Sequence, residues 1–182
     1  MLKRIRGFTL IELLIVVAIL GILAALLIPN AITAIQKAKQ KSTMKDVATI
    51  STAITDYITD NGIAPTQTGT YGGGDAFYLT LSPFYIKVLP ITDQWGTPFN
   101  VWCGAAATQY GILAPRLDDF LVASFGRDKA LGGGNPAWTS FKPANPELGL
   151  FVVNEGKDFD YDLVMWNGSW ICAPRASQTT TP

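Results

Sequence analysis

The stretch FTLIELLIVVAILGILAALLIPN, residues 8–30, decides the fold of this chain. Glu12 is its only charged residue, and a run of about 20 apolar residues is long enough to cross a bilayer as a helix. The basic residues Lys3, Arg4 and Arg6 stand just before the run. Because positive charge marks the cytoplasmic side, we expect residues 1–7 in the cytoplasm and the rest of the chain outside. The run is longer than the apolar core of a secretory signal and no A-x-A cleavage site follows it, so we expect it to remain as a membrane anchor.

Glu12 is an unusual residue inside such a run. A carboxylate at the centre of a bilayer costs about 2.5–3.5 kcal/mol even on the most lenient insertion scale. We therefore expect Glu12 to have a partner of opposite charge, and we place that partner on another copy of the same chain. The alternative is that Glu12 lies close enough to the membrane surface for its side chain to reach the headgroups.

The spacing of apolar residues changes after Pro29. Residues 31–62 carry apolar side chains mostly at every third or fourth position, which predicts an amphipathic helix with one buried stripe. The members of that stripe are Ile32, Ile35, Met44, Val47, Ile50, Ile54 and Ile58. Gly62 ends the pattern, so we expect one helix from about residue 8 to about residue 61, about 80 Å long.

Two residues in the apolar half weaken this helix. Pro29 lacks a backbone donor, and Gly21 has a low helix propensity. Together they predict a kinked or locally melted segment from Gly21 to Pro29, which would let the helix adjust as it enters a bundle. The alternative is a static kink without a role.

Residues 63–176 have the composition of a separate β-rich domain. Five short stretches resemble strands with turn residues between them: PFNVWC, DFLVASF, GLFVV, YDLVMWNG and SWICA. TQTGTYGGGD, residues 66–75, is expected to form a loop, and residues 177–182 a flexible tail. The expected fold is α+β, with a small antiparallel sheet packed on the amphipathic half of the long helix.

Composition excludes several classes of function. Fourteen basic residues balance fourteen acidic ones, so bulk charge does not favour nucleic acid as a partner. The chain has no histidine, which excludes Ser-His-Asp and Cys-His catalysis. Its glycine runs lack the GK[ST] of a phosphate-binding loop. We therefore expect a protein that is not an enzyme.

The chain has two cysteines, Cys103 and Cys172. An even count downstream of a membrane segment predicts a disulfide in an oxidising compartment. Such a bridge would close a loop of about 70 residues and contribute about 4 kcal/mol. The alternative is two buried thiols.

The opening RGFTLIELLIVVAILGILAALLIPN, residues 6–30, resembles the N-terminus of the type IV pilin-like proteins, which include type IV pilins and the pseudopilins of type II secretion. The match consists of a short basic leader ending in Gly7, then Phe8, TLIE, an unbroken apolar run and a proline. The resemblance implies that prepilin peptidase cuts between Gly7 and Phe8 and methylates the new amine of Phe8. That amine would pair with Glu12 of a neighbouring subunit at one axial stagger of the two helices, which would set the register of a helical filament.

The resemblance also implies a location and a set of partners. Such a subunit spans the inner membrane once and is then polymerised into a thin periplasmic or extracellular filament. Its partners would be further copies of itself, prepilin peptidase, minor pilins or pseudopilins, and an inner-membrane assembly platform with a cytoplasmic ATPase. Glu12 and Pro29 would be the assembly residues.

Three further stretches are similar to the major pseudopilins of type II secretion: TDQWGTPF at 92–99, DDFLVASFGRDKALGG at 118–133 and DLVMW at 162–166. In that subfamily the C-terminal loop binds one Ca²⁺. The resemblance implies Asp128 and Asp162 as ligands, with Asp158 and Asp160 as further candidates. Lys129 and the wide spacing before the last acidic cluster depart from the family pattern, and an acidic solvated loop is the alternative.

The sequence therefore predicts a structural subunit of a type IV pilus-like filament, with the closest resemblance to the type II secretion pseudopilus that drives protein export. One alternative is a type IV pilus subunit for adhesion, motility or DNA uptake, which a Cys103–Cys172 disulfide would favour. Another is a minor pilin that binds a ligand at the filament tip. A tip module would need exposed aromatic residues, and its candidates are Tyr71, Trp102, Trp138 and Trp170; core packing is the alternative for these.

Overall fold

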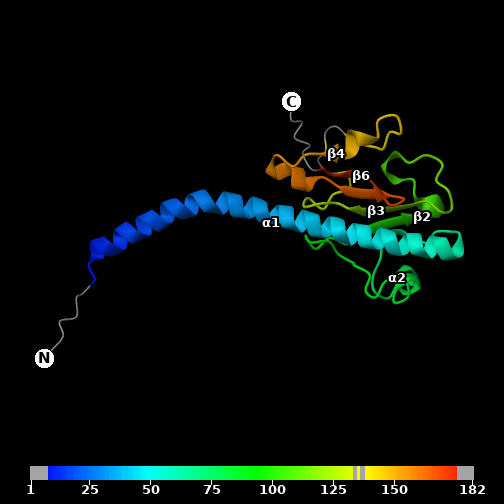
Figure 1. Ribbon diagram of the computed structural model, residues 1–182, viewed down its shortest axis with the longest axis horizontal. Coiled ribbons are helices and arrows are strands. Elements are labelled where there is room, and N and C mark those ends of the chain that lie inside the picture. The colour runs from blue at the N-terminus through cyan, green and yellow to red at the C-terminus, as the bar shows by residue number, and fades with distance from the viewer. Residues whose placement is uncertain (1–7, 133–134, 136–137, 176–182) are drawn as a thin grey trace. The chain divides into compact units, whose positions relative to one another are not determined.

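The computed structural model describes residues 8–132, 135 and 138–175 (Figure 1). The chain divides into two compact units at Lys37 and Ala38. The helix α1, Leu10–Asn61, has 52 residues and belongs to both units. Its bounds confirm the prediction of one long helix that ends just before Gly62. The leader residues 1–7, including Gly7, and the tail residues 177–182 lie outside the described residues.

The first unit consists of the apolar half of α1. Its large apolar side chains from Phe8 to Ile35 are each at least 47% exposed. Among the described residues, α1 is the one helix long and apolar enough to cross a membrane, judged by length and composition. The helix is unbroken from Gly21 to Pro29, so of the predicted kinked or locally melted segment the melted form is not present in this structure. In Figure 1 the ribbon curves gently here without interruption.

The second unit begins with the amphipathic half of α1. Val47, Ile50 and Ile54 are fully buried, which confirms the centre of the predicted stripe. Ile32 and Ile35 are instead more than half exposed, and they continue the apolar surface of the first unit. The buried stripe therefore starts later than the spacing of apolar residues suggested.

One six-stranded sheet packs on this half of α1. Its strands are β1 (Thr68–Thr70), β2 (Asn100–Cys103), β3 (Phe120–Ser124), β4 (Leu150–Phe151), β5 (Leu163–Trp166) and β6 (Ser169–Pro174), in the order β1-β2-β3-β5-β6-β4. Four pairings are antiparallel, but β4 runs parallel to β6. The predicted α+β fold, with a small sheet on the long helix, is confirmed; the sheet is antiparallel except at β4 and is therefore mixed. All five predicted strands are present.

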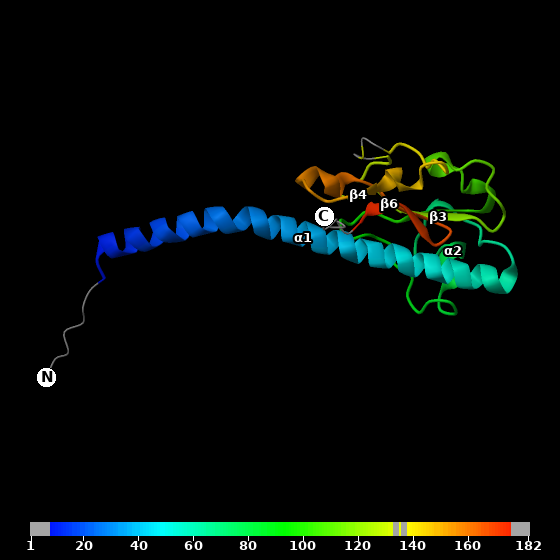
Figure 2. The same ribbon diagram turned by 45° about the horizontal axis from the view of Figure 1, so that its top comes forward.

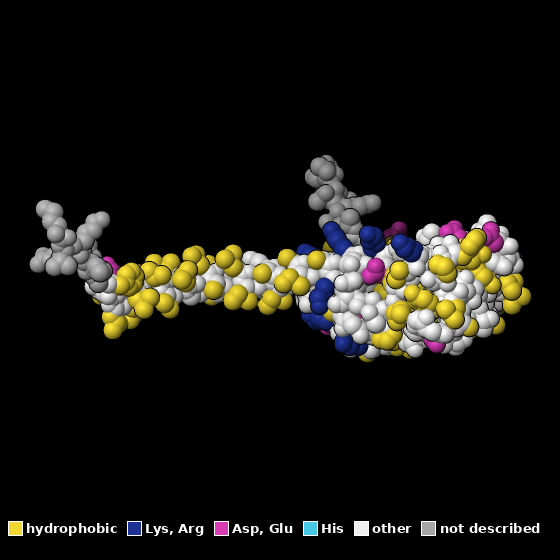
Figure 3. All heavy atoms as spheres, turned by 90° about the horizontal axis from the view of Figure 1, so that it is seen from below, with side chains coloured by type: hydrophobic (Ala, Val, Ile, Leu, Met, Phe, Trp, Pro, Cys, Tyr) yellow, Lys and Arg dark blue, Asp and Glu magenta, His cyan; other side chains and the backbone are white. Residues whose placement is uncertain are grey.

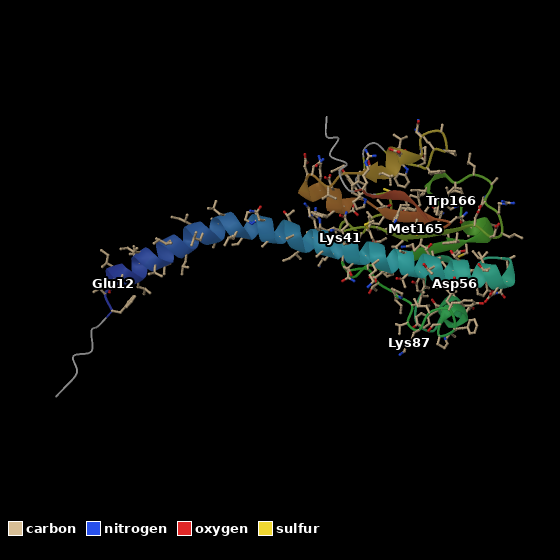
Figure 4. The ribbon with its side chains drawn as sticks, in the orientation of Figure 1. Glu12, Lys41, Asp56, Lys87, Met165 and Trp166 are labelled. Carbon is tan, nitrogen blue, oxygen red and sulfur yellow. The ribbon has the colours of Figure 1, made fainter. Side chains whose placement is uncertain are left out.

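The sheet has a core on each face. Val101, Val122 and Met165 of the sheet pack in one core with Val47, Ile50 and Ile54 of α1. Trp102, Leu121 and Leu163 face the other way and are covered by the long excursions that follow β2 and β3. Figure 2 shows these excursions on the side of the sheet away from α1. Successive residues of a strand point to opposite faces, as Met165 and Trp166 do on β5 (Figure 4).

The four aromatic residues that a tip-binding module would need to expose are packed against the cores of the second unit. Tyr71, Trp102 and Trp138 are at most 7% exposed, and Trp170 packs against both cores. Core packing is therefore the confirmed role of the first three. Two short elements were missed: β1 lies inside the stretch expected to be loop, and α2 (Ala76–Leu81) follows it.

Candidate functional site

Glu12 lies in the first turn of α1 (Figure 4). Its Oε2 accepts hydrogen bonds from the backbone N–H of Thr9 at 2.9 Å and from the Thr9 hydroxyl at 2.8 Å. The Thr9 hydroxyl oxygen in turn accepts the Glu12 N–H at 3.3 Å. This is the reciprocal capping box of a helix N-terminus. Sequence reasoning missed it, although TLIE at residues 9–12 has the T-x-x-E spacing that signals it.

The capping box gives Glu12 an orientation but not a counter-charge. Both bonds to Thr9 end on Oε2, which leaves Oε1 for another donor. Phe8, whose amine would be created by cleavage, is 73% exposed at the same end of the helix. The two residues predicted to pair between copies are therefore both accessible at the start of α1.

The apolar half of α1 is a second functional surface. Hydrophobic side chains cover the visible face of this unit in Figure 3, and between Glu12 and Lys37 the sequence has no charge. An apolar surface of this size is rare on a soluble monomer and marks contact with membrane or protein. This half of the helix therefore needs lipid or other apolar helices around it.

The stretch TDQWGTPF forms a tight turn built on Asp93. Its Oδ1 accepts the N–H groups of Trp95 and Thr97, both at 2.9 Å, and its Oδ2 accepts the Ser124 hydroxyl of β3 at 2.7 Å. From the same turn, the Gln94 N–H donates to the Thr43 hydroxyl of α1 at 3.3 Å. The turn therefore connects the sheet to α1. Sequence reasoning singled out the stretch but not the role of Asp93.

Asp128 and Asp162, the two acids that the resemblance implies as calcium ligands, have partners of their own. Asp128 is exposed, and its Oδ1 accepts the Ala130 N–H at 3.0 Å. Asp162 is 1% exposed. Its Oδ2 accepts the Tyr110 hydroxyl at 2.7 Å and the Gly132 N–H at 2.8 Å. Asp162 therefore acts as an acceptor for protein donors.

The further candidates, Asp158 and Asp160, are also engaged. Burial alone would raise the pKa of Asp158, but the N–H groups of Glu155 and Asn154 donate to its Oδ2 and hold the pKa below its usual value. Asp160 forms a two-bond ion pair with Arg127. Within the described ranges no three Asp, Glu, His or Cys residues gather to hold a metal. All four carboxylates accept hydrogen bonds from protein donors, and the calcium site stays a prediction.

The predicted disulfide is wrong. Cys103 ends β2 and Cys172 lies in β6, and β3 and β5 stand between these strands. Three strand spacings amount to about 14 Å, whereas bridged cysteines need Cα atoms within about 7 Å. The two thiols also belong to cores on opposite faces of the sheet. Both are free and buried, and burial raises the pKa of Cys103 to about 12.

This placement predicts how the thiols react with iodoacetamide at pH 8. The folded chain should be alkylated at least about a hundredfold more slowly than the unfolded chain, because the thiolate is the reactive form and burial suppresses it. The chain unfolded in guanidinium without reductant should gain two adducts, counted by mass spectrometry. An unfolded chain that gains none would instead contain the disulfide.

The N-terminal region defines the class of protein. Residues 2–28 match the family model described as the prokaryotic N-terminal methylation motif, which is the motif of prepilin-type subunits. The chain is 34% identical to the type II secretion system core protein G of Aeromonas hydrophila over 143 residues, 73% of this chain and 94% of that protein. It is 38% identical to the protein of the same name from Pseudomonas aeruginosa over 141 residues, 73% of this chain and 91% of that protein.

The Vibrio cholerae protein of that name is 35% identical over 110 residues, 54% of this chain and 71% of that protein. No solved structure matches the chain. The chain belongs to the type II secretion system core protein G family, the major pseudopilins.

Proposed function

We propose that this protein is the structural subunit of a type II secretion pseudopilus, the filament that drives protein export. The observation that carries the proposal is the exposed apolar half of α1, on a chain that belongs to the core protein G family. In the second unit the buried carboxylates of Asp93 and Asp162 accept hydrogen bonds from the hydroxyls of Ser124 and Tyr110.

The apolar half of α1 has two successive environments in this proposal. Before assembly it spans the inner membrane, with its N-terminus in the cytoplasm. In the filament the helices of other copies and of other pseudopilins replace the lipid. The contact is heterologous and does not close, so copies add without limit along one axis. Extraction from the bilayer requires work, which an assembly platform with a cytoplasmic ATPase would supply.

Glu12 sets the stagger between neighbouring copies. Prepilin peptidase would cut between Gly7 and Phe8 and leave a cationic amine in apolar surroundings, where an unpaired charge is unfavourable. The carboxylate of Glu12 on the next copy neutralises it at one axial offset. Thr9 supports this arrangement because its two bonds to Oε2 restrict the rotamer of the carboxylate.

The second unit does not favour the two alternative functions, a type IV pilus subunit and a tip-binding module. The disulfide that favoured a type IV pilus subunit is not formed, because the two cysteines lie three strands apart. The aromatic residues that a tip-binding module would expose are packed in the cores. Secretion is therefore the function that we place first.

Deletion of the gene tests the proposal. The culture medium should lose its secreted enzymes, while the same enzymes accumulate in the periplasm, and the intact gene should restore export. Sequencing of the mature polypeptide should begin at a methylated Phe8. Normal export with loss of surface filaments would instead indicate a type IV pilus, and a mature chain beginning at Met1 would exclude both.

A further inference from the structure

The C-terminal loop is the part of the chain between β3 and β5. Two short segments at its two ends are hydrogen-bonded to each other. The first segment, residues 126–132, begins two residues after the end of β3. The second segment, residues 158–162, lies directly before β5. The Arg127 N–H donates to the Phe159 carbonyl oxygen at 2.9 Å, which joins the two backbones. A Cβ on Gly126 would lie 2.7 Å from the Tyr161 carbonyl oxygen, so the segments are in close contact.

A guanidinium bridges the segments at one point. Arg127 Nε donates to Asp160 Oδ1 at 2.7 Å, and its second nitrogen donates to Oδ2 at 2.9 Å. Both oxygens of Asp160 are therefore bound to the same cation. This parallel geometry is the strongest form of a carboxylate–arginine pair.

A buried phenol holds the segments at a second point. Asp162 accepts the Gly132 N–H from the first segment and the Tyr110 hydroxyl from the excursion after β2. The Tyr110 ring stacks on Trp138, with centroids 5.4 Å apart and an interplanar angle of 18°. Burial and the neighbouring Asp162 carboxylate both raise the pKa of Tyr110, so the phenol stays protonated and remains a donor.

We infer that Arg127 and Tyr110 fasten the C-terminal loop of this protein without a metal ion. Calcium needs six to eight oxygen ligands, and here Arg127 already neutralises Asp160 while protein donors occupy Asp162 Oδ2. The cation that a calcium-bound loop would need is supplied by a side chain. We call this set of contacts the clasp: Arg127–Asp160 and Tyr110–Asp162–Gly132.

The first test measures thermal unfolding of the full-length chain in detergent micelles, followed by near-ultraviolet circular dichroism. Tm should be the same, to about 1 °C, in excess calcium chloride and in excess EGTA. A bound calcium would raise Tm by about 5 °C or more at saturation. A saturable rise of that size would overturn the inference, and this measurement needs no variant.

The second test removes one contact at a time. Tyr110→Phe keeps the ring stack but deletes the buried donor, and should lower Tm by about 4–8 °C. Arg127→Gln should lower Tm by about 2–4 °C, because its pair is partly exposed. The matched control is Lys157→Gln, whose pair with Glu155 is 68% and 65% exposed; its Tm should not change measurably.

Two results of the variant series would contradict the clasp. One is a Tyr110→Phe Tm equal to that of the unmodified chain. The other is calcium restoring the Tm of Arg127→Gln, since that would show a metal taking the place of the guanidinium. Both outcomes concern the fold of the second unit, so they are distinguishable from any failure of export or filament assembly.

Discussion

Replacing Glu12 with alanine is expected to lower the yield of filaments about a hundredfold or more. Loss of one partner from a buried ion pair leaves the Phe8 amine of each added copy without a counter-charge, which costs about 3–5 kcal/mol per contact. Each 1.36 kcal/mol is a tenfold change in the association constant. The measurement is the ratio of pelleted to total protein in sheared cells, with membrane insertion of the monomer checked in parallel.

Thr9→Ala is the matched control for this experiment. It deletes the hydroxyl that bonds Glu12 within the same chain, which costs about 1 kcal/mol of helix capping, but it keeps the carboxylate. Filament yield should therefore fall only modestly. If Thr9→Ala is as damaging as Glu12→Ala, capping explains the role of Glu12 and the ion pair between copies is excluded. Normal filaments from Glu12→Ala would exclude it as well.

The apolar half of α1 could be predicted because its signal is local. Length, apolarity and the position of the charges are read directly along residues 8–30, and no distant residue alters them. The buried stripe at Val47, Ile50 and Ile54 was predictable for the same reason, since helical spacing alone places these side chains on one face. The observed bounds of α1, Leu10–Asn61, lie within about two residues of the predicted bounds at each end.

The pairing of the cysteines could not be predicted because it depends on strand order. Both cysteines were correctly placed in strands, but the sequence does not say that β3 and β5 separate β2 from β6. The parallel strand β4 was misjudged for a related reason. A strand of two residues, Leu150–Phe151, gives no signal of the direction in which it will pair.

The acids of the C-terminal loop show a similar limit. The resemblance implied metal ligands, but the partners of Asp160 and Asp162 are donors far away in the sequence. Tyr110 is 52 residues from Asp162, and Arg127 is 33 residues from Asp160. The sequence gives no signal that either residue is a partner, because tyrosine and arginine are common in any domain. Only the fold brings each donor to its carboxylate.

Gly149→Ala is expected to lower the stability of the second unit by about 3 kcal/mol, a decrease of about 6–12 °C in Tm. Gly149 directly precedes β4, where the backbone crosses close to β6. A Cβ at this position would lie 1.7 Å from the Ile171 carbonyl oxygen and 3.1 Å from Trp138 Nε1. Backbone cannot move aside as a flexible side chain can, so β4 must separate from β6 and expose Phe151. Thermal unfolding of the full-length chain is the measurement.

Gly156→Ala is the control for this substitution, because a Cβ there meets no atom within 4 Å. Its Tm should equal that of the unmodified chain. An unchanged Tm for Gly149→Ala would contradict the parallel pairing of β4 with β6, since only that pairing brings the Ile171 carbonyl against residue 149. The pair of alanine variants therefore tests the one strand whose direction the sequence did not predict, and it does so independently of Glu12 and of the clasp.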